Sequence, residues 1–341
     1  MKRSAICLLV LCLLLSGCTP QKQPELNRYT ATFLDLFDTV TTIVGHAETK
    51  EEFEAQARSI HDNLEYYHHL FDIYNEYPGV NNLKVINDQA GISPVQVDEA
   101  IIQLLKDCKS FYELTGGRVN VAMGSVLQLW HTARNAGLSD PAGAYLPDTQ
   151  ALKLAAEHTD PEAIIIDEAA STVFISDPMV QLDVGAVAKG WATQKVAETA
   201  LEGMLISVGG NVCATGVKQT DASPWVIGIQ DPDDANGNLH TLYVSKTSVV
   251  TSGDYQRCYW VDGKPYHHII DPDTRMPGSY WRCVSIVCVD SALADALSTA
   301  LFLLPLEEGK ALAESCGAEA FWVSLTGEEY MTSGFENIMR T

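Results

Sequence analysis

Apolar side chains recur along this chain at the spacings that are typical of helices and strands. Over residues 49–70 they fall at steps of four and three, and so share one face of a predicted helix. The same period starts after Asp98, a good N-cap residue, and ends at Gly116-Gly117, where glycines are typical of a helix C-terminus. Further helices are predicted over residues 146–158, 188–201, 292–303 and 306–316.

Runs rich in β-branched and aromatic residues predict the strands between these helices. The first is residues 37–45, and two hairpins are predicted, one pairing 164–166 with 173–175 and one turning at Asp262-Gly263. Single strands are predicted over residues 179–184, 204–208, 225–230, 239–250, 284–289 and 319–325. This order predicts an α+β fold, with mixed or antiparallel sheets flanked by helices. Because no clear linker divides the chain, we expect a single body with interleaved subdomains.

The N-terminus predicts export and lipid attachment. Residues 1–17 are interpreted as a signal peptide, because two basic residues precede an apolar run that is too short to span a bilayer. The run ends in Leu-Ser-Gly-Cys, which resembles a bacterial lipobox, and a lipobox implies that Cys18 becomes the acylated N-terminus. A plain secretion signal with a chance cysteine is the alternative. Acyl chains such as palmitate on Cys18 would hold the protein on the extracytoplasmic face of a cell membrane, or in a periplasm.

Residues 18–33 are predicted to be the lipidated cysteine and a tether. They are mostly polar, include two prolines and show no apolar period. The folded domain is therefore expected to span residues 34–341.

The formal charge of the chain is −22, from 44 acidic and 22 basic residues. Such an excess of negative charge argues against nucleic acid as a partner and against charge-driven binding to anionic lipid. It does not exclude an anionic substrate, provided that a metal ion or helix N-termini supply local positive potential.

Of the nine cysteines, two lie in the signal and one is Cys18, which leaves six. None of these forms a CxxC pair, so a structural zinc site is not expected. Buried free thiols are predicted instead, although an exported protein would also tolerate a disulfide.

The segment from Asp183 to Gly190, DVGAVAKG, follows an apolar run and opens a predicted helix. Its small residues let the backbone approach a ligand, and the free amides of a helix start favour phosphate oxygens. Lys189 would neutralise a phosphate, and Asp183 would bind the polar edge of a ring. The segment is neither a P-loop nor a GxGxxG fingerprint, and a tight turn without a ligand is the alternative.

Asp295 and Thr299 lie one turn apart near the start of an otherwise apolar predicted helix. Completed by a backbone carbonyl and substrate phosphates, a carboxylate and a hydroxyl suit Mg²⁺, which takes few protein ligands. The alternative is an acidic residue that only favours the helix dipole.

His267 and His268 adjoin Ile269-Ile270-Asp271-Pro272 on a predicted strand, so only one of the two would face a site. A histidine suits proton removal from a hydroxyl near neutral pH. A half-exposed strand histidine without a catalytic role is the alternative.

Taken in order, five segments of the chain resemble the ApbE family of FAD:protein FMN transferases. They are DVGAVAKGWA at 183–192, ISVGGNVCATG at 206–216, TSGDYQR at 251–257, HHIIDPDT at 267–274 and ADALSTALF at 294–302. Their order and spacing agree over essentially the whole mature body, and the lipobox agrees as well. The resemblance implies an ApbE or T-fold-like architecture.

The resemblance also implies an enzymatic reaction, with FAD as substrate and Mg²⁺ as cofactor. A threonine or serine hydroxyl of an acceptor flavoprotein would attack the FMN-side phosphorus of FAD. FMN would become linked to the acceptor through a phosphoester bond, and AMP would leave.

The same resemblance implies roles for individual residues. Asp295, Thr299 and the carbonyl of Ala186 would bind Mg²⁺. His268 would be the catalytic base, with His267 the weaker choice. The remaining implied residues would contact the flavin nucleotide: Phe37, Tyr74, Arg118, Val119, Asn120, Asp183, Lys189 and Ile270.

Two segments depart from the family pattern. Residues 117–122 read GRVNVA where the family commonly has G-x-F-D-x-T, and Thr274 is followed by Arg275 where the family usually has glycine. Two readings stay open beside the transferase. One is a magnesium-dependent FAD pyrophosphatase that yields FMN and AMP, and the other, suggested by the first departure, is a flavin-binding lipoprotein without catalysis.

Overall fold

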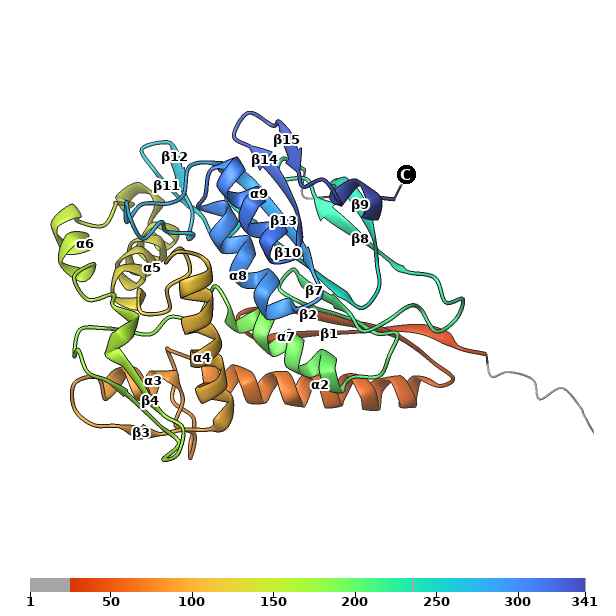
Figure 1. The fold of residues 1–341 in the computed structure, drawn as a ribbon, viewed down its shortest axis with the longest axis horizontal. Coiled ribbons are helices and arrows are strands. Elements are labelled where there is room, and N and C mark those ends of the chain that lie inside the picture. Colours follow the sequence, from red (N-terminus) through yellow and green to blue (C-terminus); the bar gives the residue numbers. More distant parts are fainter. Residues whose placement is uncertain (1–24, 235, 341) are drawn as a thin grey trace, which may run out of the picture.

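The computed structural model describes residues 25–234 and 236–340 and confirms the predicted α+β class (Figure 1). Its main element is an eight-stranded antiparallel sheet with the strand order β1-β2-β6-β7-β10-β13-β14-β15. The strands are β1 (Asn27–Leu36), β2 (Thr39–Ala47), β6 (Leu205–Val208), β7 (Asn211–Ala214), β10 (Thr247–Gly253), β13 (Trp281–Cys288), β14 (Glu319–Ser324) and β15 (Glu329–Met331).

Helices cover one face of this sheet and a β-hairpin covers the other. The helices are α2 (Lys50–Phe71), α7 (Ala188–Thr199), α8 (Ser291–Phe302) and α9 (Leu306–Ser315). Figure 1 shows α2 running along β1 and β2, while α8 lies against β10 and β13. The hairpin of β8 (Trp225–Gln230) and β9 (Asn238–Val244) packs on the opposite face, together with the 3-10 helix η3 (Phe335–Ile338).

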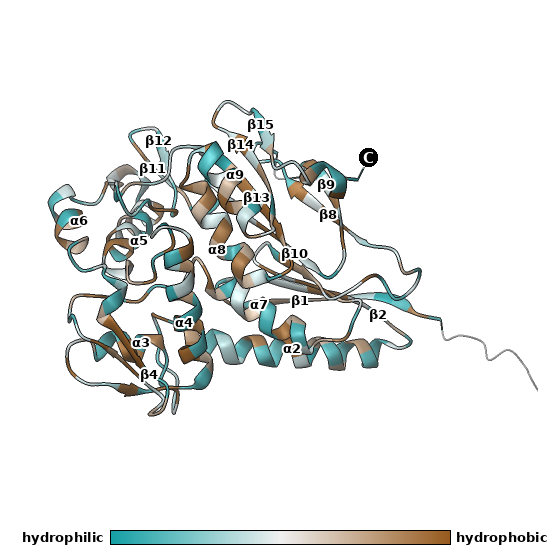
Figure 2. Ribbon diagram, in the orientation of Figure 1, coloured by the Kyte–Doolittle hydropathy of each residue, from teal (hydrophilic) through white to brown (hydrophobic). Residues whose placement is uncertain are grey.

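Alternate residues of the central strands face these two layers. In β13, Val284 and Ile286 pack with the helices, whereas Cys283 and Val287 pack with the β8–β9 hairpin. A strand that is buried on both faces reads as a nearly continuous apolar run, and this explains the composition of β13. Figure 2 shows the centre of the molecule around α8 and β13 as mainly hydrophobic.

The chain between α2 and α7 forms the other end of the molecule. Its helices are α3 (Leu83–Asp88), α4 (Glu99–Leu114), α5 (Gly124–Ser139) and α6 (Thr149–Ala155), with 3-10 turns η1 (Pro141–Gly143) and η2 (Pro161–Ala163). Its small sheet has the order β3 (Val95–Gln96), β5 (Thr172–Ile175), β4 (Ile164–Asp167). The hairpin of β11 (Tyr259–Val261) and β12 (Lys264–Tyr266) packs on α5.

The two ends of the molecule share one core. A single hydrophobic cluster contains Ile101 of α4, Val173 of β5, Val284 of β13 and Leu297 of α8. Elements from both ends bury side chains against each other. This shared core fixes the positions of the elements that line a cavity between the two ends.

Most predicted elements are confirmed to within a few residues, but three predicted strands are not: residues 179–184, residues 239–250 and the strand assigned to His267 and His268. Residues 179–184 form no strand; one isolated bridge joins Gln181 to Met123. The predicted strand 239–250 is two strands, separated by a turn in which Lys246 has a φ of +50°. Helix α5 and strands β1 and β7 were not predicted at all.

The prediction of a tether over residues 18–33 is wrong for residues 27–33, because β1 begins at Asn27. Tyr29, Ala31 and Phe33 of β1 pack on the cluster formed by α2 and the adjoining strands. The residues between them are polar, so the strand carries only half of an apolar pattern. Such a pattern is typical of an edge strand with one solvated face, and it resembles a linker in composition.

Polar side chains cap the N-termini of helices α2 and α8. Thr49 and Glu52 form a reciprocal capping box at α2. Glu52 N donates to Thr49 Oγ1 at 3.2 Å, and Thr49 N donates to Glu52 Oε2 at 3.3 Å. Asp290 accepts hydrogen bonds from Ala292 N and Leu293 N at the start of α8. A cap of this kind contributes about 1 kcal/mol and, more importantly, fixes the register of the helix.

The six cysteines in the described part of the chain are free thiols, and four of them are buried, as predicted: Cys108, Cys213, Cys283 and Cys288. Between residues 25 and 340, no described helix is both long enough and apolar enough to cross a membrane.

Helices α7 and α8 cross at Gly190, where the backbone of α7 contacts the Asp295 side chain of α8. A Cβ at this position would overlap both the Asp295 Cβ and the Ser291 carbonyl oxygen. Glycine is therefore required here for close approach of the two helices rather than for backbone freedom.

We expect the variant Gly190→Ala to lower the free energy of unfolding by at least about 1 kcal/mol, because the added methyl forces α7 and α8 apart. This is a net value, since the higher helix propensity of alanine offsets about 1 kcal/mol of the clash. Urea unfolding measures the change. The control is Glu198→Ala, an exposed position on the same helix, which should stay within about 0.5 kcal/mol of the wild type. A Gly190→Ala protein as stable as the wild type would contradict the close crossing.

Candidate functional site

A cavity of about 340 Å³ lies between the helix-covered sheet and the end of the molecule that contains α4 and α5. The residues that the sequence singled out line it, apart from His267, the weaker choice of base, and Cys18, which lies outside the described residues. They are Phe37, Tyr74, Arg118, Val119, Asn120, Asp183, Ala186, Lys189, His268, Ile270, Asp295 and Thr299. They come from segments that are far apart in sequence, so the fold brings them together.

Asp295 is buried at the α7–α8 crossing, with 5% of its surface exposed. Its Oδ2 accepts a hydrogen bond from Gly190 N at 2.8 Å. Burial raises the pKa of this carboxyl, and the positive charge of Lys189, the Gly190 amide and the Asn211 side chain oppose that rise. Among the described residues, no basic side chain forms an ion pair with Asp295 within 4.0 Å. The carboxylate therefore lacks a full counter-charge.

The groups around Asp295 fit a hard divalent cation. Thr299 lies one helical turn further along α8, and Ala186 lies in the turn before α7; both line the cavity with Asp295. A carboxylate, a hydroxyl and a backbone carbonyl are the oxygen ligands that Mg²⁺ prefers. A cation beside Asp295 would also provide the missing counter-charge and lower the pKa of the buried carboxyl.

Next to Asp295, the backbone of α8 is anchored to the sheet by hydroxyl contacts. Ser298 Oγ donates to the Asp295 carbonyl at 2.9 Å and lies 2.8 Å from Ser252 Oγ at the end of β10. Ser291 donates from Oγ to the buried Asn211 Oδ1 at 2.7 Å. These contacts hold the face of α8 that carries Asp295 and Thr299.

The segment from Asp183 to Lys189 forms a tight turn that opens α7. Asp183 Oδ1 accepts from Gly185 N at 2.9 Å, while Asp183 N donates to Val121 O at 2.9 Å. No side chain caps the start of α7. Three of the first four amides of the helix nevertheless donate already, Ala188 N to Val184 O, Gly190 N to Asp295 Oδ2 and Trp191 N to Val187 O. Among the first four, Lys189 N is left to bind an anion at the positive end of the helix dipole. Lys189 reaches back to the Gly185 carbonyl at 3.3 Å, so its ammonium group lies over this turn.

His268 faces the cavity and His267 does not. His267 donates from Nε2 to the Gly278 carbonyl at 2.9 Å and accepts at Nδ1 from Ile269 N at 3.2 Å, so both its nitrogens are occupied. The Nδ1 of His268 is buried without a hydrogen-bond partner. The strand placement was wrong, because β12 ends at Tyr266, but the preference for His268 agrees with this geometry.

Burial and positive charge keep His268 neutral. Burial lowers its pKa to about 3, and Arg257, His267, Lys189 and Arg134 act in the same direction. A neutral imidazole with an unpartnered nitrogen has a lone pair or an N–H available for a ligand in the cavity.

Tyr74 and Phe37 form an aromatic wall of the cavity. The Tyr74 hydroxyl lies 2.8 Å from His131 Nδ1, which links the loop after α2 to α5. Phe37 packs edge-on against His68, and its backbone N donates to His68 Nδ1 at 3.2 Å. Phe37 has a φ of +53° in the β1–β2 turn, a conformation that is uncommon for a bulky residue and that directs this turn to the cavity.

Asp72 organises the loop that carries Tyr74. It accepts hydrogen bonds from Tyr74 N, from the backbone and side chain of Asn75, and from the Tyr77 hydroxyl. Burial raises the pKa of the Asp72 carboxyl, but these hydrogen bonds outweigh it and hold the pKa below its usual value.

The segment at 118–122 keeps an ordered turn despite its unusual sequence. Asn120 Oδ1 accepts from Ala122 N at 2.9 Å, and Asn120 Nδ2 donates to the Thr159 carbonyl at 2.8 Å. Arg118 forms ion pairs with Asp271 at 3.2 Å and with Asp273 at 2.7 Å. These contacts join the turn to the 271–275 loop, in which Arg275 has a φ of +61° where the family usually has glycine.

Sequence reasoning missed the residues that α5 and the surrounding loops contribute to the cavity: His68, Asp72, His131, Arg134, Asn211, Ser252 and Arg257. One signal was present. Val126, Trp130, Ala133 and Gly137 are buried at helical spacing, which would have predicted α5 and placed His131 and Arg134 on it.

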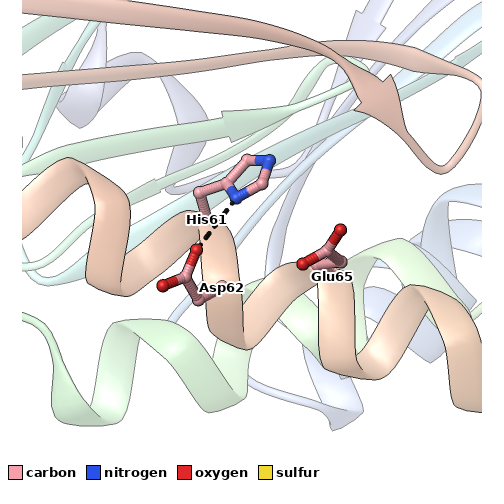
Figure 3. Close-up of side chains that lie close together, drawn as sticks. All are labelled: His61, Asp62 and Glu65. Carbon is pink, nitrogen blue, oxygen red and sulfur yellow. Dashed lines mark hydrogen bonds and ion pairs between the residues drawn. The ribbon is translucent and has the colours of Figure 1, made fainter.

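A second group of ionisable side chains lies on α2 next to strand β1, outside the cavity (Figure 3). His61, Asp62 and Glu65 place ligand-type atoms within 4.8 Å of one another. Both nitrogens of His61 already contact carboxylates, Asp35 at 3.1 Å and Asp62 at 3.2 Å. An ion-paired histidine on an exposed helix accounts for this group without a metal.

Known proteins resemble this chain in sequence. The model of the ApbE family matches residues 37–322. The FAD:protein FMN transferase of Treponema pallidum is 38% identical over 261 residues, covering 71% of this chain and 70% of the relative. The FAD:protein FMN transferase of Klebsiella pneumoniae is 33% identical over 230 residues, covering 66% and 68%.

Solved structures resemble the fold as well. The crystal structure of the ApbE protein from Thermotoga maritima superposes with a TM-score of 0.82 at 29% identity, covering 92% of this chain and 100% of that one. The flavin transferase ApbE from Vibrio cholerae superposes with a TM-score of 0.76 at 22% identity, with the same coverage. The extent of the family match and the identity to the Treponema relative together establish that this chain belongs to the ApbE family.

Proposed function

We propose that this protein transfers FMN from FAD to a threonine or serine hydroxyl of an acceptor protein in a magnesium-dependent reaction. Relatives at 38% and 33% identity carry the name FAD:protein FMN transferase. The observation that carries the proposal is the cavity itself. It combines a buried carboxylate without an ion-pair partner, the ammonium group of Lys189 at a helix start and a neutral histidine in one space.

The reaction forms one phosphorus–oxygen bond and breaks another. The acceptor hydroxyl oxygen attacks the FMN-side phosphorus of FAD, and its proton passes to His268. The bond from that phosphorus to the bridging oxygen breaks, and the electron pair stays on the oxygen, which leaves as part of AMP. The product is FMN joined to the acceptor by a phosphoester bond.

Different residues of the cavity would bind the phosphates, hold the flavin ring and accept the proton. Lys189 would bind phosphate oxygens, because its ammonium group and the positive end of the α7 dipole supply positive potential at the same turn. Phe37 and Tyr74 would hold the flavin ring, whose flat apolar face suits an aromatic wall. His268, neutral in the free protein, is in the correct protonation state to accept a proton.

Asp295, Thr299 and the Ala186 carbonyl would hold Mg²⁺. When bound there, the ion would neutralise charge on the diphosphate as the bridging bond breaks. The hydrogen bond from Gly190 N keeps the carboxylate of Asp295 directed at this pocket.

We also propose that Cys18 is lipidated and that it attaches the protein to the extracytoplasmic face of a cell membrane. The support is the lipobox-like Leu-Ser-Gly-Cys in the sequence, since Cys18 lies outside the described residues. Strand β1 starts at Asn27, so only a short segment would separate the anchor from the sheet. Metabolic labelling with a radioactive fatty acid, compared with Cys18→Ser, tests this attachment.

The activity test uses the purified protein with FAD, Mg²⁺ and an acceptor protein that has a threonine in an Asp-Gly-like context. Acceptor that becomes covalently yellow, with one AMP released per FMN attached, supports the transferase. Release of AMP without labelled acceptor would identify a pyrophosphatase instead. Tight FAD binding with neither product would identify a flavin-binding protein without catalysis.

The variant Asp295→Asn should lose about 100-fold or more of the magnesium-dependent activity, because the metal pocket loses its only carboxylate and several kcal/mol of charge stabilisation. Asparagine has nearly the same shape and can still accept the Gly190 hydrogen bond, so the fold should persist. Initial rates against Mg²⁺ concentration measure the effect. The control Glu308→Gln, on the exposed face of α9, should behave as the wild type. Full magnesium-dependent activity in Asp295→Asn would refute the metal assignment.

The variant His268→Gln should slow FMN transfer by roughly 100-fold or more while FAD affinity stays within a few-fold of the wild type, because the lost group acts on the acceptor proton. Stopped-flow transfer rates and equilibrium FAD binding separate the two quantities. If FAD affinity collapses instead, the histidine is a binding residue.

In the ligand-free protein, the imidazole of His268 should remain neutral well below pH 6.5. Its pKa is lowered by burial and by the surrounding cations, so protonation of the folded protein requires more acid than protonation of an exposed histidine. NMR titration of isotope-labelled histidine side chains, with His268→Gln to assign the signal, measures this. A midpoint at or above pH 6.5 would show that the cationic surroundings do not act as described.

A further inference from the structure

Two arginines that the sequence did not single out line the cavity together. Arg134 comes from α5, and Arg257 comes from the turn that follows β10. Their charges act on one another: burial and then Arg257 lower the pKa of the Arg134 guanidinium, and both arginines act on His268. Two like charges thus line the same cavity, Arg134 from a half-buried position and Arg257 from an exposed one.

Neither arginine has a counter-ion. Among the described residues, neither guanidinium forms an ion pair or a hydrogen bond. Two other arginines are paired twice each, Arg118 with Asp271 and Asp273, and Arg282 with Asp233 and Asp254. Arg134 and Arg257 differ from them in lining the cavity without an ion pair, although the charge of Asp183 acts on Arg134. Two unpaired guanidinium groups in one cavity favour an external anion.

The backbone is constrained to keep Arg257 where it is. Arg257 has a φ of +46°, a left-handed conformation that costs a non-glycine residue free energy. The turn is anchored by the ion pair of Arg282 with Asp254 at 3.0 Å and by the hydrogen bond from Asp254 N to Arg282 O at 2.9 Å. The surrounding structure thus holds a strained residue that makes no stabilising ion pair in return.

Arg134 lies beside His268, and both arginines act on the charge of that histidine, whereas neither acts on Asp295. His268 and Arg134 both line the main cavity and a small hollow of about 10 Å³ behind it. Lys189 is the cation that acts on Asp295, and it also acts on His268. Positive charge therefore extends from the metal pocket through Lys189 to the two arginines.

We propose that Arg134 and Arg257 form an anion subsite that holds phosphate oxygens of the donor nucleotide on the side of the cavity next to His268. This subsite rests on the proposed function, because it assumes a diphosphate as ligand. A diphosphate has anionic oxygens on both phosphorus atoms. A metal ion beside Asp295 would bind some of these oxygens, and the arginines would bind others. Guanidinium groups match phosphate geometry through paired N–H donors. The subsite would also retain the phosphate of AMP until that product leaves.

The test measures flavin binding without metal, so that the contribution of the metal pocket is removed. In EDTA buffer the wild type should bind FAD more tightly than riboflavin, which has no phosphate, and inorganic diphosphate should displace FAD. Arg134→Gln and Arg257→Gln should each weaken FAD binding about 10-fold or more, with riboflavin affinity unchanged. Fluorescence quenching of the flavin and calorimetry both report these affinities.

Two further variants serve as controls. Arg58→Gln makes the same change at an exposed position of α2 outside the cavity and should bind FAD as the wild type. Arg257→Lys keeps the charge and should retain part of the FAD affinity, which tests the subsite even if Arg257→Gln folds poorly.

Distinct results would overturn the subsite. Unchanged FAD binding in both glutamine variants would do so, as would an equal loss of FAD and riboflavin affinity, which would indicate a structural role. A raised KM for the acceptor with unchanged FAD affinity would show that the arginines bind an acidic acceptor segment instead. If the wild type neither binds FAD nor labels the acceptor, the proposed function itself is wrong. If the wild type labels the acceptor while the variants bind FAD normally, only the subsite is wrong.

Discussion

The close crossing of α7 and α8 at Gly190 is the contact on which the site depends. Only a residue without a Cβ lets the backbone of α7 reach the carboxylate of α8, where Gly190 N donates to Asp295. That single hydrogen bond partly compensates a buried carboxylate whose pKa burial has raised. The same crossing brings the start of α7, with Ala186 and Lys189, to the cavity wall that holds Asp295, so the proposed metal and phosphate sites depend on one helix contact.

Positive charge gathers on one side of the cavity. The chain is strongly acidic and carboxylates also line the cavity, yet the charges of Lys189, Arg134 and Arg257 act on His268. In the proposed reaction, these cations would supply the electrostatic attraction for an anionic nucleotide. They add to the effect of burial, which lowers the pKa of His268 and keeps the imidazole neutral. A bound anion would offset these cations and raise the basicity of the imidazole.

The residues proposed for the metal, the flavin and the base could be singled out from the sequence because most of them lie in short segments whose order and spacing resemble those of a family. Arg134 and Asp72 could not, because neither lies in such a segment. Arg257 lies in TSGDYQR, one of the matching segments, but the resemblance implied no role for it. Helix α5 was missed since its buried face contains glycines as well as apolar residues, which weakens the periodic signal. Strand β1 was taken for a tether because an edge strand with one solvated face has the composition of a polar linker. The strand assigned to His267 and His268 was wrong, because local β-propensity does not reveal where a hairpin ladder ends.

The sequence by itself determined the α+β class, most of the helices and strands, and the residue types for binding a hard cation and a phosphate. These features depend on local periodicity, capping and small-residue turns, all of which are expressed within a few consecutive residues. The tertiary structure alone decided which of these residues meet, that His268 rather than His267 faces the cavity, and that Arg134 and Arg257 remain unpaired beside it. Those facts depend on burial and on contacts between segments more than a hundred residues apart, and no local pattern encodes a distance of that kind.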